Sequence, residues 1–143
     1  MSVKSIPDNS NMTSLDIQTV LESLGKLEIS DQTTGDEASA AMKIFGSFNQ
    51  CMVGIVSFSG STPWERHQDD ELLQIIEGEV DVTVLSEEET RKITLRLGSV
   101  FIVPRGLWHN QSSPQGVKLI FITSKEGNEE SSAEDPRITP FSI

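Results

Sequence analysis

The sequence predicts an all-β fold, a sandwich or barrel, preceded by a short N-terminal helix. Short runs of β-branched and aromatic residues follow one another at regular intervals from Met42 onward, separated by turn residues. In residues 80–84, valine alternates with aspartate and threonine, so one face of that strand is buried and the other faces solvent. A chain of 143 residues is about the size of one domain and is long enough to bury a core.

Residues 1–40 are predicted to form a leader and one helix. The first twelve residues are small and polar around Pro7, which is typical of a mobile segment. An amphipathic helix is then expected, capped by Thr13 or Ser14 and ended by Gly25, with its apolar side on the outside of the sheet. Residues 28–39 are polar and are predicted to be a loop. The apolar positions of the helix, spaced i, i+3, i+4 and i+7, are Ile17, Val20, Leu21 and Leu24.

Residues 41–123 are predicted to form the barrel. An acidic turn, residues 86–90, is expected to join two of its strands as a hairpin, and antiparallel strands of this kind fit a double-sheet jelly roll. The predicted strands are Lys43–Phe48, Cys51–Phe58, Glu71–Ile76, Glu79–Leu85, Lys92–Leu97, Val100–Val103 and Val117–Thr123.

Residues 124–143 are predicted to form an acidic tail with a terminal segment. The stretch 124–137 is polar and acidic, so we expect it to be disordered or loosely attached to the barrel. Ile138 and Phe141 are the apolar residues that could tie the end of the chain back to the domain.

The chain contains 2 histidines, and each stands among residues suited to a metal site. If the stretch around His67 is extended, Glu65, Asp69 and Glu71 project from the same side as its imidazole. Asp69 is more simply explained as part of a bend, and a bulge would remove it from this face. His109, arriving from a distant strand, would complete a nitrogen and oxygen site for a divalent transition metal.

The stretch around His109 resembles the second motif of the cupin superfamily, G-x5-P-x-G-x2-H-x3-N. It is matched from Gly98 through Pro104 and Gly106 to His109 at every spacing, and Ser113 stands where the final asparagine is usual.

The stretch around His67 resembles the first cupin motif, G-x5-H-x-H-x(3,4)-E-x6-G. His67, Glu71 and Gly78 stand in register, whereas Glu65 occupies the place of the first histidine and Gly60 is one residue too close. The resemblance extends over residues 42–123 and implies a small single-domain cupin with a degenerate first motif. The fold it implies is a double-stranded β-helix, the jelly-roll barrel of that superfamily.

The resemblance also implies a metal set and three classes of function. His67, Glu71 and His109, with Glu65, would hold Fe, Mn, Ni or Zn, and the protein would be a metal-dependent dioxygenase, isomerase or lyase. If it does not bind the metal, Glu65 is the candidate general base. Alternatively, the pocket binds a small ligand or a metal without turnover, or the domain is a dimeric scaffold with a vestigial pocket.

Composition restricts the partners and the compartment. With 11 basic and 22 acidic residues, the net charge is −11, which argues against binding nucleic acid or an anionic membrane surface. A single cysteine, Cys51, excludes an internal disulfide and fits a reducing compartment, and no signal peptide is recognised. We therefore expect a cytoplasmic protein, a homodimer, with a small molecule as its ligand.

Overall fold

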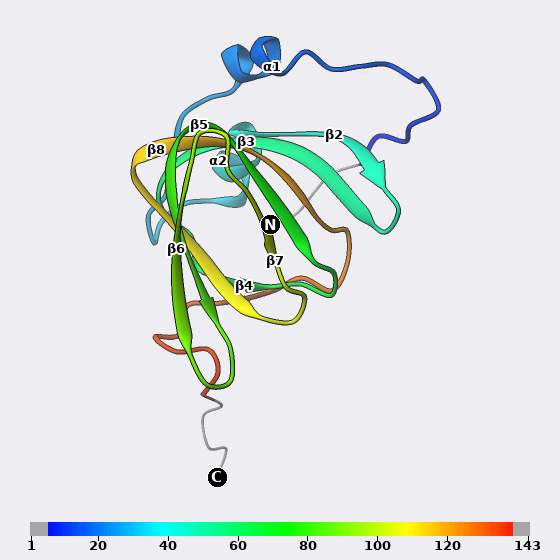
Figure 1. The fold of residues 1–143 in the computed structure, drawn as a ribbon. Helices are drawn as coiled ribbons and strands as arrows, with labels where there is room; N and C mark the ends of the chain where they lie inside the picture. Colours follow the sequence, from blue (N-terminus) through cyan, green and yellow to red (C-terminus); the bar gives the residue numbers. More distant parts are fainter. Residues whose placement is uncertain (1–5, 139–143) are drawn as a thin grey trace.

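Two long strands, β5 (Glu71–Leu85) and β8 (Trp108–Ser124), form the frame of a β-barrel (Figure 1). The structure is a computed structural model that describes residues 6–138. The all-β barrel with a short N-terminal helix predicted from the sequence is confirmed. The other strands are β1 (Leu27–Glu28), β2 (Met42–Phe48), β3 (Cys51–Ser61), β4 (Trp64–Arg66), β6 (Thr90–Arg96), β7 (Val100–Val103) and β9 (Glu129–Ser131), and the helices are α1 (Ile17–Ser23) and α2 (Gly35–Ala40).

Strand β5 replaces two strands that the sequence predicts as separate. It pairs with β8 on both sides of a bend, where the register shifts, and Gly78 lies at that bend with a φ of +83°. A Cβ at this position would lie 2.3 Å from the carbonyl oxygen of Gly116. The glycine looks like a strand break in the sequence, but in the structure it lets one strand bend and continue to pair with β8.

The remaining strands extend this frame on both sides. Strand β3 pairs with β8, and β2 and β1 pair with β3. Strands β6 and β7 pair with β5, and the predicted hairpin between β5 and β6 is confirmed by the bond from the Ser86 amide to the Glu89 carbonyl oxygen, 3.0 Å. The barrel interior is filled by aliphatic side chains of β5 and β8, among them Leu73, Ile75 and Leu119.

The N-terminal region differs from the prediction in detail. Helix α1 does pack its apolar side on the sheet, where Val20 and Leu21 join a buried cluster with Ile55. It is capped by Asp16 rather than by Thr13 or Ser14, and it ends at Ser23 before Gly25 is reached. The predicted loop over residues 28–39 is wrong in part, because a capping box at Thr34 starts α2 and because Glu28 closes β1.

The acidic tail is attached to the barrel, which corrects the prediction of a loose or disordered segment. Strand β9 pairs antiparallel with β4, and in Figure 1 this last part of the described chain runs along β4 at one end of the barrel. Ile138 is 69% exposed and does not tie the end of the chain to the core, and Phe141 lies outside the described residues. None of the helices among residues 6–138 is long and apolar enough to cross a bilayer.

Candidate metal centre

His109 is held in the centre of the strand framework. It lies on β8, directly across from Glu65 on β4 and from Val84 on β5, and it is 2% exposed. Its Nδ1 lies 3.2 Å from the carbonyl oxygen of Leu107, which can only accept, so Nδ1 carries a proton and donates it. Its Nε2 therefore faces the cluster formed with Glu65, His67 and Glu71, which we call the pocket, and it contacts Glu71 Oε1 at 3.1 Å.

His67 follows the short strand β4, where the chain bends before β5 begins. The turn of the second motif fixes this bend. The amide of Gly106 donates to the carbonyl oxygen of His67 at 2.9 Å, and the amide of Arg105 donates to the carboxylate of Asp70 at 2.8 Å. The two segments with cupin-like spacing are therefore joined by direct hydrogen bonds, although they lie almost forty residues apart in the sequence.

The imidazole of His67 also directs Nε2 into the pocket. Its Nδ1 lies 2.8 Å from Oδ1 of Asn128, and its side chain is buried. Nε2 is buried and has no hydrogen-bond partner among residues 6–138. It lies 3.5 Å from an oxygen of Glu71 and 3.7 Å from an oxygen of Glu65. Buried polar atoms in folded proteins nearly always have a partner, and a ligand or an ion at this position would supply one to the nitrogen.

The structure brings together the residues that the sequence nominates as metal ligands. Ligand atoms of Glu65, His67 and His109 all lie within 4.8 Å of one another, and Glu71 reaches each imidazole with a different carboxylate oxygen. Asp69 does not join them. The chain bends at this residue, and its carboxylate accepts a hydrogen bond from Ser124 Oγ at 2.7 Å, so the alternation of an extended strand does not apply to it.

The carboxylates and His109 have shifted proton affinities. Burial, together with the negative charge of Glu71, raises the pKa of Glu65 to about 7. Burial would also raise the pKa of Glu71, but its hydrogen bond and charge interaction with His109 outweigh this and lower it. Burial lowers the pKa of His109, and the contact with Glu71 more than compensates, so the pKa is raised. Both shifts favour the charged forms of Glu71 and His109, which contact each other at 3.1 Å.

These separations suit a divalent metal. Two ligands about 2.1 Å from a tetrahedral ion are about 3.4 Å apart, and the nitrogen-to-oxygen separations between the imidazoles and the carboxylates are 3.1, 3.5 and 3.7 Å. Two ionised carboxylates also balance the charge of a divalent cation, and two neutral imidazoles add nitrogen donors. The unpartnered Nε2 of His67 is the strongest sign of fit, because it has no role in holding the protein together.

Two polar side chains near the histidines were not found from the sequence. Asn128 holds His67 from the tail, a segment whose composition gives no sign of pairing. Gln111 lies two residues after His109 on β8, and its Oε1 is buried without a partner among the described residues. Strand alternation starting from His109 could have nominated Gln111 as a second residue on the inner face of β8.

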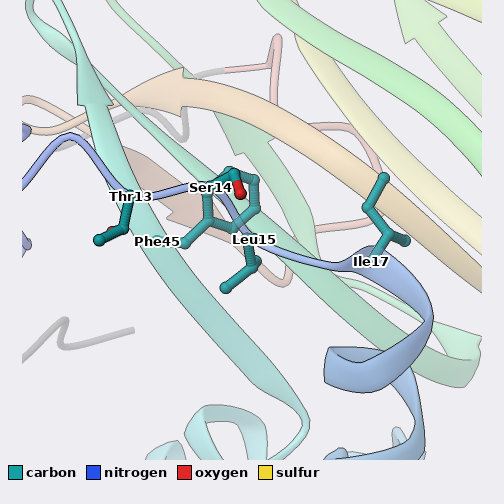
Figure 2. Close-up of a pocket in the computed structure, with 5 residues that line it drawn as sticks. All are labelled: Thr13, Ser14, Leu15, Ile17 and Phe45. Carbon is teal, nitrogen blue, oxygen red and sulfur yellow. The ribbon is translucent and has the colours of Figure 1, made fainter.

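Two surface hollows do not include these side chains. One lies between the N-terminal segment and β2 and is lined by side chains without a titratable group, as Figure 2 shows. A second is lined by parts of β1, β3, β5 and β8 and contains Lys26 and Lys118. Neither includes a histidine. The lining residues of the first are Thr13, Ser14, Leu15, Ile17 and Phe45.

Comparison with known proteins finds a family match for much of the barrel. The family model described as "Cupin domain" matches residues 54–123. A cupin-2 domain containing protein from Shewanella frigidimarina is 22% identical, with 59% of this chain and 79% of that chain covered and a TM-score of 0.50. A protein from Neisseria meningitidis is 19% identical, with 79% and 100% covered and a TM-score of 0.60.

Enzymes are among the similar structures. A hydroquinone 1,2-dioxygenase, solved in complex with Cd²⁺ and 4-hydroxybenzonitrile, is 20% identical, with 58% of this chain and 63% of that chain covered and a TM-score of 0.50. At such identities the likeness concerns the fold. Comparison with curated proteins gives no match.

Proposed function

This chain contains a small cupin-superfamily domain, and we propose that its pocket binds one divalent transition metal and uses it in catalysis on a small molecule. The ligands proposed are Nε2 of His67, Nε2 of His109 and the carboxylate of Glu65, with Glu71 as a fourth. The observation that carries this proposal is the convergence of two imidazole nitrogens on two carboxylates, with the Nε2 of His67 left unpartnered among residues 6–138.

A metal bound at these residues would supply Lewis acidity to a small molecule beside it, in a reaction of the dioxygenase, isomerase or lyase type. The protein's own residues would orient the imidazoles and balance the charge. The Leu107 carbonyl oxygen holds the ring of His109 with Nε2 inward. The carboxylate of Glu71, which contacts both imidazoles, would offset the positive charge of a cation bound between the two rings. The hydroquinone dioxygenase among the similar structures was solved with Cd²⁺ and a small aromatic molecule, which is consistent with this class of ligand.

Glu65 has two proposed roles, which a substitution separates. As a ligand, it gives the metal a carboxylate at the position where the first cupin motif has a histidine. As a general base, it uses the pKa of about 7, which places its proton exchange near neutral pH. Glu65→Gln should weaken metal binding in the first case, whereas in the second it should leave metal content unchanged and abolish turnover. Glu77→Gln, which removes an exposed carboxylate from β5, the strand that also carries Glu71, is the matched control.

The first test is elemental analysis after loading with Fe²⁺, Mn²⁺, Ni²⁺ or Zn²⁺ and desalting. We expect close to one metal ion per chain in the unmodified protein and in Glu77→Gln, and almost none in His67→Ala and His109→Ala. A folded protein that retains none of the four metals would contradict the proposal. A loaded protein without activity across small-molecule substrates would favour the alternative, a cupin that binds metal or ligand without turnover.

We further propose a homodimer in the cytoplasm, on the basis of the family resemblance and the single cysteine. Sedimentation equilibrium of the loaded protein should give twice the mass of the chain. A monomer at micromolar concentration would contradict the dimer and leave the metal proposal unaffected.

A further inference from the structure

The tail reaches the pocket through a specific contact. Strand β9 pairs with β4 in the register Trp64 with Ser131, Glu65 with Glu130 and Arg66 with Glu129. Continued by one residue, this register places Asn128 opposite His67, and the two side chains are in contact at 2.8 Å.

The orientation of the Asn128 amide is determined by its second contact. Its Nδ2 donates to the carbonyl oxygen of Ser124 at 3.0 Å, and a carbonyl oxygen can only accept. The oxygen Oδ1 must therefore face His67, so it is the acceptor of the 2.8 Å contact and Nδ1 of His67 is the donor. With its proton on Nδ1, a neutral imidazole presents a lone pair at Nε2, the atom that faces Glu65 and Glu71.

Gly127 shapes the turn that makes this contact possible. It has a φ of +76°, a conformation that other residues adopt at a cost, and a Cβ there would meet the side chain of Gln68 at 2.0 Å. The chain leaves β8 at Ser124, turns at Gly127 and returns along β4. The amide of Asn128 is thereby held between the end of β8 and the imidazole.

We propose that Asn128 is a positioning residue for the metal centre, which fixes the ring and the tautomer of His67 so that Nε2 presents its lone pair to the metal. The inference rests on the metal site proposed above. It assigns a role to the tail, which lies outside the residues matched by the family model. Hydrogen bonding to the second nitrogen of a metal-bound imidazole is a general way to orient it and to raise its basicity.

Two substitutions separate positioning from simple anchoring of the tail. Asn128→Ala removes both contacts of the side chain. Asn128→Asp keeps an oxygen that accepts from Nδ1 of His67 but loses the donor to the Ser124 carbonyl oxygen. Asn11→Ala makes the same substitution at an exposed asparagine in the N-terminal segment and is the control.

The experiment measures the dissociation constant for Zn²⁺ by competition with a chromophoric chelator, at neutral pH. We expect Asn128→Ala to weaken binding by about 10- to 100-fold, and Asn128→Asp and Asn11→Ala to keep the affinity of the unmodified protein. If Asn128→Asp is weakened as much as Asn128→Ala, the residue only anchors the tail. If neither substitution changes the affinity, the proposal is wrong.

A second measurement needs no metal. Nitrogen chemical shifts of the imidazoles, recorded on histidine-labelled protein without metal, should show the Nδ1–H tautomer for His67 in the unmodified protein and a mixture of tautomers in Asn128→Ala. An Nε2–H tautomer in the unmodified protein would overturn the proposal. Failure of the unmodified protein to bind Zn²⁺ would instead overturn the proposed function, and the tautomer would still show whether Asn128 holds the ring.

Discussion

The two histidines of the pocket are held by different parts of the molecule. His109 lies on β8, between β4 and β5, and its Nδ1 is hydrogen-bonded to the backbone of Leu107, the residue just before that strand. His67 lies beyond the end of a strand of three residues, and its Nδ1 is bonded to a side chain of the tail. One proposed metal ligand is therefore built into the core of the barrel. The other depends on a short strand and on a segment near the end of the described chain.

Because of this difference, the stability of the barrel and the position of the proposed metal ligands depend on different parts of the chain. The part of the pocket around His109 cannot change without disturbing β5 and β8, whose paired strands carry most of the larger buried apolar cluster. The part around His67 can change when β9 is altered, while the barrel is preserved. Substitutions in the first part should affect folding and metal binding together, and substitutions in the second should affect metal binding more than folding.

The largest contrast is expected between His109→Ala and His67→Ala in the metal-free protein. Removing His109 leaves the carboxylate of Glu71, which is 5% exposed, without its hydrogen-bond partner. The free energy of unfolding should fall by about 3–5 kcal/mol, as when one member of a buried ion pair is removed. His67→Ala should cost clearly less, because Nε2 of His67 makes no hydrogen bond within residues 6–138. Urea unfolding measures both, and equal losses would contradict the comparison.

Truncation after Lys125 removes β9 and Asn128 while keeping all of β8. We expect the barrel to remain folded, with an unchanged β-sheet circular dichroism spectrum, because β9 contributes three exposed or half-buried residues. The affinity for Zn²⁺ should fall by about tenfold or more, since the ring of His67 loses its acceptor. A truncated protein that unfolds would show that the tail stabilises the barrel itself.

The pH dependence of the metal-free protein is the next effect in size. The pKa of His109 lies above its ordinary value of 6.5, so its stabilising contact is present below that pH and is lost as pH rises through the raised pKa. Glu65, with a pKa of about 7, keeps a proton that the unfolded chain releases near 4.5, and stability falls between these values as pH rises. Glu71, with a lowered pKa, stabilises above 4.5 and ceases to do so as pH falls further.

The metal-free protein should therefore be most stable at mildly acidic pH and should lose stability as pH rises through about 7. Bound metal should reverse this trend, because metal ligands must be deprotonated. Denaturant midpoints measured over a pH series, with and without Zn²⁺, test both statements. Stability of the metal-free protein that rises steadily with pH would contradict the pairing of Glu71 with His109.

The smallest effect is expected at the outer edge of the tail. Arg66 on β4 forms a salt bridge with Glu129 on β9, and its guanidinium lies 4.4 Å from the centroid of the Trp108 ring. The charged groups are 40% and 52% exposed, so Glu129→Gln should cost about 0–1 kcal/mol of stability. Zn²⁺ affinity should be unchanged, because Asn128 keeps its backbone turn. A loss of affinity like that of Asn128→Ala would show that pairing of β9, rather than the amide, holds His67.

The sequence predicts the barrel well because its strands carry their own local signals. Alternation in residues 80–84 reports which face is buried, and the spacing around His109 is fixed by a turn whose glycines and proline are visible in the sequence. The helix α2 lies in the stretch predicted to be a loop, although Thr34 and Glu37 form a capping box that the sequence displays. Its length of six residues is too short for the apolar spacing that identified α1.

The tail could not be predicted from the sequence, since what orders it is not local. Glu129 and Glu130 are polar and occur in an acidic stretch, which on composition favours disorder. They form a strand because β4 offers an unpaired edge and Gly127 turns the chain back toward it. The contact between His67 and Asn128 joins residues 61 positions apart, and no pattern within either segment reports it. Pairing between distant segments is where sequence patterns carry least information.

The most direct test of this account is a Zn²⁺ titration of histidine-labelled protein, followed through the nitrogen shifts of its 2 imidazoles. We predict that both Nε2 signals move together and reach their end points at one equivalent of Zn²⁺, while both Nδ1 nitrogens keep their protons. This result would place the two rings on one ion. A shift of only one imidazole, or of neither at saturating Zn²⁺, would contradict the claim that the pocket is a metal centre built on His67 and His109.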